Sequence, residues 1–167
     1  DSYEQITRQF AHWDDIAIHY RGEQLTSTGH GFCGLSRQVL LSILQQRCQE
    51  LGVELRFEQE LHASDLERYR EVDLLLGTDG LNSIVRTHYE QEFEPQIDLR
   101  PNRFVWLGTT FPFAAFTFYF KENAHGLWRV HAYRYAPQAP AGEPQSTFIV
   151  ECTEDTFRRS GLAEADE

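Results

Sequence analysis

The sequence predicts an α+β fold, and two observations carry this prediction. Four β-rich segments follow one another after residue 103 with turn residues between them, which is typical of an antiparallel sheet. Before them, helical and strand patterns alternate along the chain. We therefore expect an α/β part over 1–102 and a mostly antiparallel sheet over 103–167, packed as one compact unit. The β-rich segments are 104–110, 115–121, 127–136 and 147–152.

The first part centres on residues 72–86, with the sequence VDLLLGTDGLNSIVR. Its three consecutive leucines predict a short strand that is buried on both faces and ends in a tight turn. Asn82 or Ser83 can then cap a short helix. Asp79 would lie at the carboxyl end of the strand, where open α/β sheets bind ligands. An Asp-Gly pair is also common in turns for conformational reasons alone, so both interpretations stay open at this point.

Local patterns predict the elements on either side of this stretch. Ser2 and Gln5 fit a capping box, so we expect a helix over about the first dozen residues. Alternation at 16–20 and 24–28 around a turn at 21–23 predicts a hairpin at a sheet edge. Further expected elements are a strand at 53–58, a short charged helix or turn at 63–70, a loop at 137–145 and a last helix capped by Thr153.

Residues 29–34, GHGFCG, match the dinucleotide-binding pattern G-x-G-x-x-G, and a predicted helix follows them. The first strand of a dinucleotide-binding fold is buried on both faces and should therefore be apolar. Residues 23–28 read EQLTST instead. We therefore predict that this match is not a dinucleotide site.

Ser36 is a good N-cap for a helix that runs with apolar spacing until Gly52 ends it. Arg37 is unusual in the first turn, because a cation there opposes the helix dipole at a cost of up to about 1 kcal/mol. A bound anion would offset that cost, since free N–H groups and a guanidinium together form a phosphate site. A solvated arginine that tolerates the penalty is an equal alternative on the sequence alone.

Composition excludes several classes of function. The net charge of −11 argues against nucleic-acid and anionic-membrane partners, because both require a basic surface. No apolar run is long enough to span a membrane, and we expect a cytoplasmic protein. The three cysteines and seven histidines lack metal-ligand spacing, so no metal site is predicted. Because the chain lacks Met and begins at Asp1, we expect it to be a piece of a longer polypeptide. Its expected protein partner is the rest of that polypeptide.

The motif D-G-x-x-S-x-V-R at 79–86 resembles the Asp-Gly motif of the flavoprotein aromatic monooxygenases, which have the p-hydroxybenzoate hydroxylase fold. Two further stretches resemble the branch that hydroxylates aromatic CoA thioesters, the salicylyl-CoA 5-hydroxylases and 2-aminobenzoyl-CoA monooxygenases. They are GHGFCGLSRQVLLSILQQRCQELGVELRF and RPNRFVWLGTTFPFAAFTFYF. The resemblance implies part of an FAD-binding domain joined to a substrate-binding sheet. It also implies hydroxylation of an aromatic ring with FAD, O₂ and NADH or NADPH.

The resemblance further implies roles for four residues. Arg37 would contact FAD, Asp79 and Gly80 would lie near the FAD pyrophosphate and the approach of the nicotinamide cofactor, and Arg86 would offer charge to the latter. The family's glycine-rich βαβ unit and its later Gly-Asp motif are absent from this chain, so we expect the chain alone to bind no FAD. A non-catalytic small-molecule-binding module built on an antiparallel sheet is the alternative.

A pairing register across 111–135 leads to a candidate substrate wall. With Lys121 opposite Leu127, three phenylalanines at 116, 118 and 120 face Trp128, Val130 and Ala132 on one apolar side. The other side is then a polar and aromatic stripe, which either lines a cavity for an aromatic acyl thioester or is a solvated sheet face. The stripe comprises Thr117, Tyr119, Arg129, His131 and Tyr133.

Overall fold

The computed structural model of the protein describes residues 1–136 and 143–165. The chain divides into two compact units, one formed by 1–53 with 101–167 and the other by 54–100. The assignment of a cofactor role to 1–102 and a substrate role to 103–167 stays a prediction.

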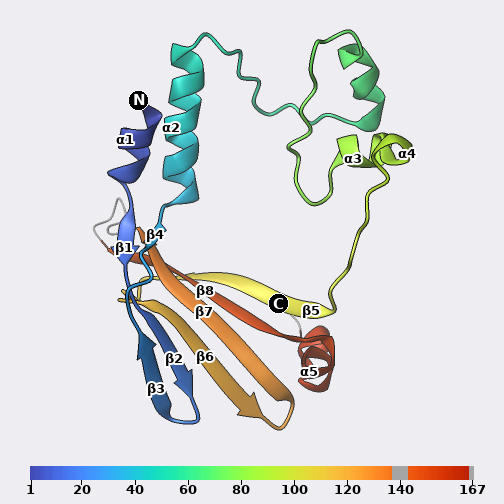
Figure 1. The fold of residues 1–167 in the computed structure, drawn as a ribbon. Helices are drawn as coiled ribbons and strands as arrows, with labels where there is room; N and C mark the ends of the chain where they lie inside the picture. The colour runs from blue at the N-terminus through green and yellow to red at the C-terminus, as the bar shows by residue number, and fades with distance from the viewer. Residues whose placement is uncertain (137–142, 166–167) are drawn as a thin grey trace. The chain divides into compact units, whose positions relative to one another are not determined.

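The first unit is built on a six-stranded sheet with the strand order β3-β2-β6-β7-β8-β5 (Figure 1). Neighbouring strands are antiparallel except β2 and β6, which run parallel. The sheet is therefore mostly antiparallel, and the edge hairpin of the first half of the chain is part of it. The strands are β2 (Ile16–Tyr20), β3 (Glu23–Ser27), β5 (Asn102–Thr109), β6 (Phe116–Asn123), β7 (Gly126–Ala136) and β8 (Gln145–Thr153).

The hairpin and the four β-rich segments form as predicted. Arg21 and Gly22 make the turn between β2 and β3 with φ of 50° and 86°. Two consecutive residues with positive φ give the hairpin turn that matches the twist of paired strands. β3 lies at the sheet edge with every residue exposed. Of the predicted loop at 137–145, residues 137–142 lie outside the described residues, and Gln145 already belongs to β8.

The predicted N-terminal helix is shorter than expected. α1 (Ser2–Thr7) ends early because β1 (Ala11–Trp13) pairs with β4 (Phe32–Gly34) in a separate two-stranded sheet. Its N-cap is Asp1, whose Oδ1 accepts a hydrogen bond from the amide of Tyr3 at 3.0 Å, so the predicted cap at Ser2 is also wrong.

α2 (Arg37–Glu50) begins after Ser36 and stops before Gly52, which has a φ of 73°. The predicted start and stop are therefore confirmed, although the Ser36 side chain forms no cap hydrogen bond. β4, which contains Gly34, lies between the other two glycines of 29–34 and α2, and exposed β3 precedes them. This geometry differs from that of a dinucleotide-binding fold, in which a buried strand leads directly into a helix. No residue of α2 is buried.

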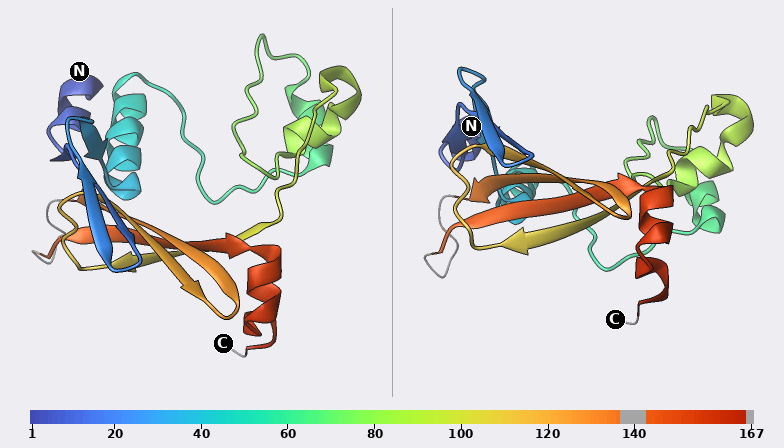
Figure 2. Two further views of the ribbon diagram at one scale, coloured as in Figure 1. Left: turned by 60° about the horizontal axis from the view of Figure 1, so that its bottom comes forward. Right: turned by 90° about the horizontal axis from the view of Figure 1, so that it is seen from below.

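A short helix packs at the end of the sheet that lies away from β1 and β4. α5 (Glu154–Arg159) follows β8 and packs where β7 begins, whereas β1 and β4 contact the sheet toward the end of β7 (Figure 2). The amide of Thr156 donates to Thr153 Oγ1 at 3.3 Å, so the predicted cap of this helix is confirmed. A 3-10 turn, η2 (Leu162–Glu164), ends the described residues. None of the described helices has the length and apolar character needed to cross a membrane.

The second unit contains helices and turns but no strand. It comprises η1 (Ala63–Tyr69), α3 (Ile84–His88) and α4 (Glu90–Phe93). The strands predicted around 53–58 and at the leucine run are absent, and Leu74 and Leu76 are 73% and 71% exposed. A strand is defined by hydrogen bonds to a neighbouring strand, and residues 54–100 provide none. The helix capped by Ser83 is confirmed, since Ser83 Oγ accepts from the amide of Arg86 at 3.0 Å.

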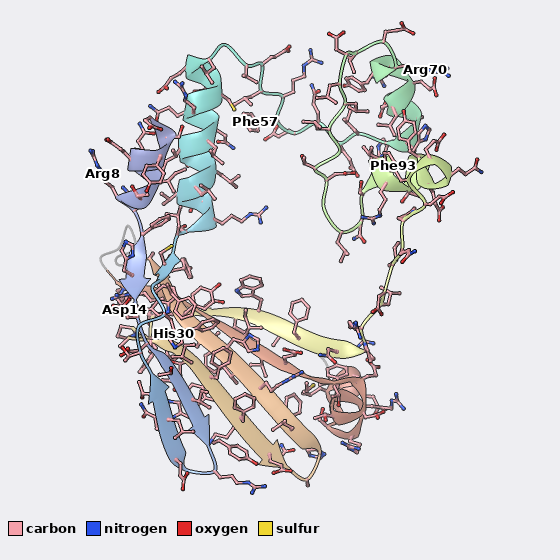
Figure 3. All side chains as sticks on the ribbon, in the orientation of Figure 1. Arg8, Asp14, His30, Phe57, Arg70 and Phe93 are labelled. Carbon is pink, nitrogen blue, oxygen red and sulfur yellow. The ribbon has the colours of Figure 1, made fainter. Side chains whose placement is uncertain are left out.

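The predicted register between β6 and β7 is wrong by one residue. Lys121 pairs with Trp128, and Asn123 pairs with Gly126, so the turn is shorter than the loop 122–126 that pairing Lys121 with Leu127 would leave. Asn123 Oδ1 accepts hydrogen bonds from the amides of His125 (2.9 Å) and Gly126 (3.2 Å), which stabilises this tight turn. On this sheet, whose side chains are drawn in Figure 3, the Phe116 ring lies 4.6 Å from that of Phe118 and 5.2 Å from that of Tyr133 between centroids.

Candidate functional site

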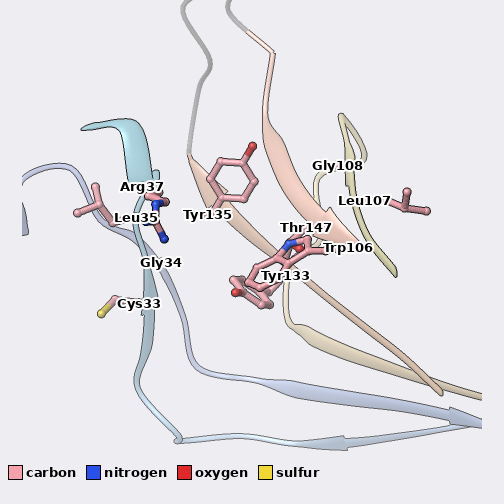
Figure 4. Close-up of a pocket in the computed structure, with 10 residues that line it drawn as sticks. All are labelled: Cys33, Gly34, Leu35, Arg37, Trp106, Leu107, Gly108, Tyr133, Tyr135 and Thr147. Atoms are coloured by element: carbon pink, nitrogen blue, oxygen red, sulfur yellow. The ribbon is translucent and has the colours of Figure 1, made fainter. Parts of the chain in front are cut away.

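A pocket of about 520 Å³ lies in the first unit where α2 and β4 meet the sheet (Figure 4). β5, β7 and β8 provide one side, and the segment from β4 into the first turn of α2 provides the other. Leu107 is at its edge, with a side chain that points away from the other lining residues in Figure 4. The side chains that give the pocket its chemical character are Arg37, Trp106, Tyr133, Tyr135 and Thr147.

Three aromatic rings supply flat apolar surface to this pocket. Tyr133 is fixed by its neighbours, because its ring stacks on Trp13 with centroids 5.7 Å apart and meets Phe116 edge-on at 5.2 Å. The Tyr135 hydroxyl donates to Gln145 Oε1 at 3.2 Å, which orients that ring. Trp106 remains 64% exposed. The pocket therefore combines fixed rings on β7 with an accessible indole on β5.

Arg37 is the cation among the side chains that line the pocket. Within the part of the chain that the structure describes, it forms no ion pair. It belongs to the first turn of α2, where unsatisfied backbone N–H groups also favour an anion. Arg37, predicted from the sequence as a cofactor contact, and Tyr133, predicted as a substrate contact, thus line one pocket.

Gly34 brings the start of α2 close to β7. A Cβ atom at this position would lie 2.9 Å from the carbonyl oxygen of Arg134 and 3.1 Å from the Trp13 ring. Real Cβ atoms are rarely so close to backbone oxygen, so only glycine allows this approach. The last glycine of the 29–34 motif therefore has a packing role beside the pocket.

The register divides the predicted substrate stripe between two faces of the sheet. Arg129, His131 and Tyr133 share the pocket face with the β6 phenylalanines, because Phe118 pairs with His131 and Phe120 with Arg129. The predicted assembly of all five stripe residues on one face is therefore wrong, although a substrate role for any one of them stays a prediction.

Thr117 and Tyr119 lie on the opposite face of the sheet, where they pair with Ala132 and Val130. They line a second pocket of about 370 Å³. The Tyr119 ring stacks on His19 there, with centroids 4.5 Å apart. This pocket is separated from Arg37 and Tyr133 by the sheet itself.

Glu151 is a functional candidate that the sequence reasoning missed. Its Oε1 accepts hydrogen bonds from Arg129 Nη2 at 2.7 Å and from Asn102 Nδ2 at 2.6 Å, and its Oε2 lies 3.5 Å from His131 Nε2. The Arg129 charge is therefore already paired within the protein. No local pattern marks Glu151, since β8 reaches these partners only through sheet pairing.

In the second unit, Asp79 holds the turn before α3. Its two carboxylate oxygens accept hydrogen bonds from Ser83 Oγ and from the amide of Ile84, each at 2.6 Å. The Ser83 hydroxyl, followed by backbone amides, lowers the pKa of the Asp79 carboxyl from its ordinary value. The Arg86 guanidinium donates to the carbonyls of Gly80 and Leu81, and Gly80 adopts a φ of 80°. This unit has its own pocket of about 470 Å³, which Asp79 helps to line.

No family model matches the chain. Over 159 residues, or 95% of its length, the chain is 36% identical to a salicyloyl-CoA 5-hydroxylase of a Streptomyces species. Over all 167 residues it is 31% identical to protodeoxyviolaceinate monooxygenase of Chromobacterium violaceum. Over 151 residues, or 90% of its length, it is 28% identical to 3-hydroxy-4-methyl-anthranilyl-(aryl-carrier protein) 5-monooxygenase of Streptosporangium sibiricum. The chain is a homologue of aromatic monooxygenases. It spans 29%, 43% and 40%, respectively, of these relatives.

The chemistry of the first pocket fits a planar aromatic group that also carries polar or anionic atoms. Three rings offer stacking surface, Arg37 offers a guanidinium, and Thr147 Oγ1 is buried without a hydrogen-bond partner among the described residues. Both a flavin and an aromatic substrate have this character. No described group of three or more His, Cys, Asp or Glu side chains is arranged to hold a metal ion.

Proposed function

We propose that this chain is part of an FAD-dependent monooxygenase that uses NADH or NADPH to hydroxylate an aromatic substrate. The observation that carries the proposal is the 36% identity to a salicyloyl-CoA 5-hydroxylase, which extends over 95% of the chain. Similarity over this length includes both the Asp79 turn and the sheet with its aromatic pocket. The activity belongs to the intact protein.

The proposed substrate is an aromatic acyl thioester. One relative is named for a CoA ester and another for an acyl group on an aryl-carrier protein. Both names support a substrate in which an aromatic acyl group is attached to a larger carrier. In the first pocket, the rings of Tyr133, Tyr135 and Trp106 suit a planar ring, and the open side of the pocket suits a substituent that extends outward.

When bound, FAD would supply the redox chemistry with O₂, and the residues of this chain would position the reactants. Arg37 would donate hydrogen bonds to an anionic group of FAD, because it forms no ion pair with any described residue and lies in the first turn of α2. Arg86 would offer charge to the nicotinamide cofactor. Asp79 would keep the turn that contains Gly80 in the shape seen here, through its bonds to Ser83 and Ile84.

The test uses the intact protein, purified and examined for a flavin absorbance spectrum in stoichiometric amount. Substrate-dependent oxidation of NADH or NADPH is then measured with benzoyl, 2-hydroxybenzoyl and 2-aminobenzoyl thioesters, and the products are examined for a mass increase of one oxygen atom. Hydroxylated product with bound flavin would support the proposal. A protein without flavin that binds aromatic thioesters and forms no product would instead be a non-catalytic binding module.

A further inference from the structure

Thr147 has a buried hydroxyl group with no hydrogen-bond partner in the part of the chain that the structure describes. The residue is 2% exposed, and its Oγ1 forms no hydrogen bond with any described residue. Four other buried residues with a side-chain hydroxyl are described, and each hydroxyl is hydrogen-bonded: Ser83 to Asp79, Thr117 to Ala115, Ser146 to Phe111 and Thr156 to Thr153. Trp13 Nε1 and Arg134 Nε are also buried without a described partner, but neither residue lines the first pocket. A buried hydroxyl without a partner is costly, so Thr147 requires an explanation that the other four do not.

The position of Thr147 supplies that explanation. It lies on β8 between Gly108 of β5 and Tyr133 of β7, and all three line the first pocket. A Cβ atom built on Gly108 would meet nothing within 4 Å, so the strand beside Thr147 leaves open space on the pocket side. The ring of Tyr133 is next to Thr147 on its other side, and Trp106 is two residues from Gly108 along β5.

We propose that Thr147 is a specificity-determining residue, whose Oγ1 hydrogen-bonds a hydroxyl, amino or carbonyl substituent of a planar aromatic ligand placed over Gly108. The ligand's ring would lie against Tyr133 and Trp106, and its substituent would satisfy the unpaired hydroxyl. This inference rests on the proposed function, because it assigns a residue that selects the aromatic substrate. A site built around such a polar atom rejects ligands that lack the matching group more strongly than an apolar site would.

The test measures binding rather than turnover. Isothermal titration calorimetry of the intact protein uses N-acetylcysteamine thioesters of benzoate and of 2-, 3- and 4-hydroxybenzoate as probes. At least one hydroxybenzoyl probe is expected to bind about 3- to 10-fold more tightly than the benzoyl probe, which corresponds to one neutral hydrogen bond. Thr147→Val should abolish that ratio, whereas Thr147→Ser should retain it.

Two further variants locate the effect. Ser146→Ala removes the neighbouring buried hydroxyl, which already donates to Phe111 at 2.7 Å, and should lower the melting temperature without changing the binding ratio. Gly108→Ala places a methyl group in the open space and should weaken all four probes together. The inference is overturned if wild-type protein shows no preference, if Thr147→Val keeps the preference, or if Gly108→Ala leaves every affinity unchanged.

The outcome can be separated from that of the proposed function. Flavin content and product formation test the monooxygenase activity, and the binding ratio tests Thr147. A flavoprotein that hydroxylates substrate but keeps its ratio in Thr147→Val would overturn only the role of Thr147. A flavin-free protein with a Thr147-dependent ratio would retain the binding role and overturn the activity.

Discussion

Glu151 Oε1 accepts a hydrogen bond from Arg129 Nη2 at 2.7 Å, across the β7–β8 pair on the face that also carries Tyr133. The two side chains are 20% and 35% exposed, so the pair is partly shielded from water. Arg129 thereby differs from Arg37, which has no ion pair among the described residues. An arginine that is already paired offers a bound anion less than an unpaired one does.

We expect the Arg129–Glu151 pair to stabilise the sheet by about 1 kcal/mol, since a partly shielded ion pair exceeds the small value of an exposed one. A double-mutant cycle with Arg129→Gln and Glu151→Gln, followed by urea unfolding, measures this coupling. The exposed pair Arg8–Glu4 of α1 is the control and should show a coupling of at most a few tenths of a kcal/mol. Equal couplings at the two sites would contradict the prediction.

Substitution of His131 or Arg129 by alanine tests the predicted substrate role of this face in the intact protein. If these side chains contact the substrate, KM should rise and NAD(P)H oxidation should become less coupled to hydroxylation. Glu151→Gln should then act in the same direction, because it releases both side chains. If all three variants kept the wild-type KM and the wild-type coupling of NAD(P)H oxidation to hydroxylation, Arg129 and His131 would have no substrate role.

Arg37 and Arg86 are expected to serve different ligands. In the intact protein, Arg37→Ala should weaken FAD retention, and Arg86→Ala should mainly raise the KM for the reduced nicotinamide cofactor. A charge-assisted hydrogen bond to phosphate contributes roughly 1.5–3 kcal/mol, so each effect should be at least about tenfold. Arg8→Ala, on exposed α1, is the control. Wild-type flavin content and kinetics in both variants would make Arg37 and Arg86 ordinary surface charges.

Asp79 should make the turn before α3 sensitive to acid. Because hydrogen bonds lower its pKa in the folded state, its stabilising contribution is present above its pKa in the unfolded chain, about 3.9, and is lost as pH falls through the lower folded-state value. NMR titration of the carboxyl carbon should give a midpoint below that of an unfolded peptide with the same sequence. Ser83→Ala should move the midpoint back up, since Ser83 is the main cause of the shift. An unperturbed midpoint in wild-type protein would contradict the hydrogen bonds that Ser83 and Ile84 donate to Asp79.

Gly34→Ala should destabilise the first unit by roughly 1–3 kcal/mol, because its methyl group would overlap the Arg134 carbonyl and the Trp13 ring. Gly108→Ala is the matched control, since the added methyl group meets no atom within 4 Å there. Thermal unfolding of both variants measures the contrast. Similar melting temperatures for the two variants would show that β4 can move away from β7 without loss.

The helix caps, the hairpin turn and the strands named here could be predicted from the sequence, because each depends on residues close together in the chain. The caps at Ser83 and Thr153 are bonds to residues three positions on, and the Arg21-Gly22 turn needs only a backbone that tolerates positive φ. The four β-rich segments follow from composition and alternation. The resemblance to aromatic monooxygenases can also be recognised from the sequence, because the residues of the Asp-Gly motif lie in one short stretch, 79–86.

The site itself was decided by the tertiary structure. Asn123 shortened the turn between β6 and β7, and a shift of one residue moved side chains of the predicted stripe to opposite faces, because side chains alternate along a strand. Sheet pairing then brought Glu151 to Arg129 and placed Thr147 beside Gly108, from segments dozens of residues apart. Hydrogen bonds between distant strands depend on which strands become neighbours, and no short stretch of sequence contains that information.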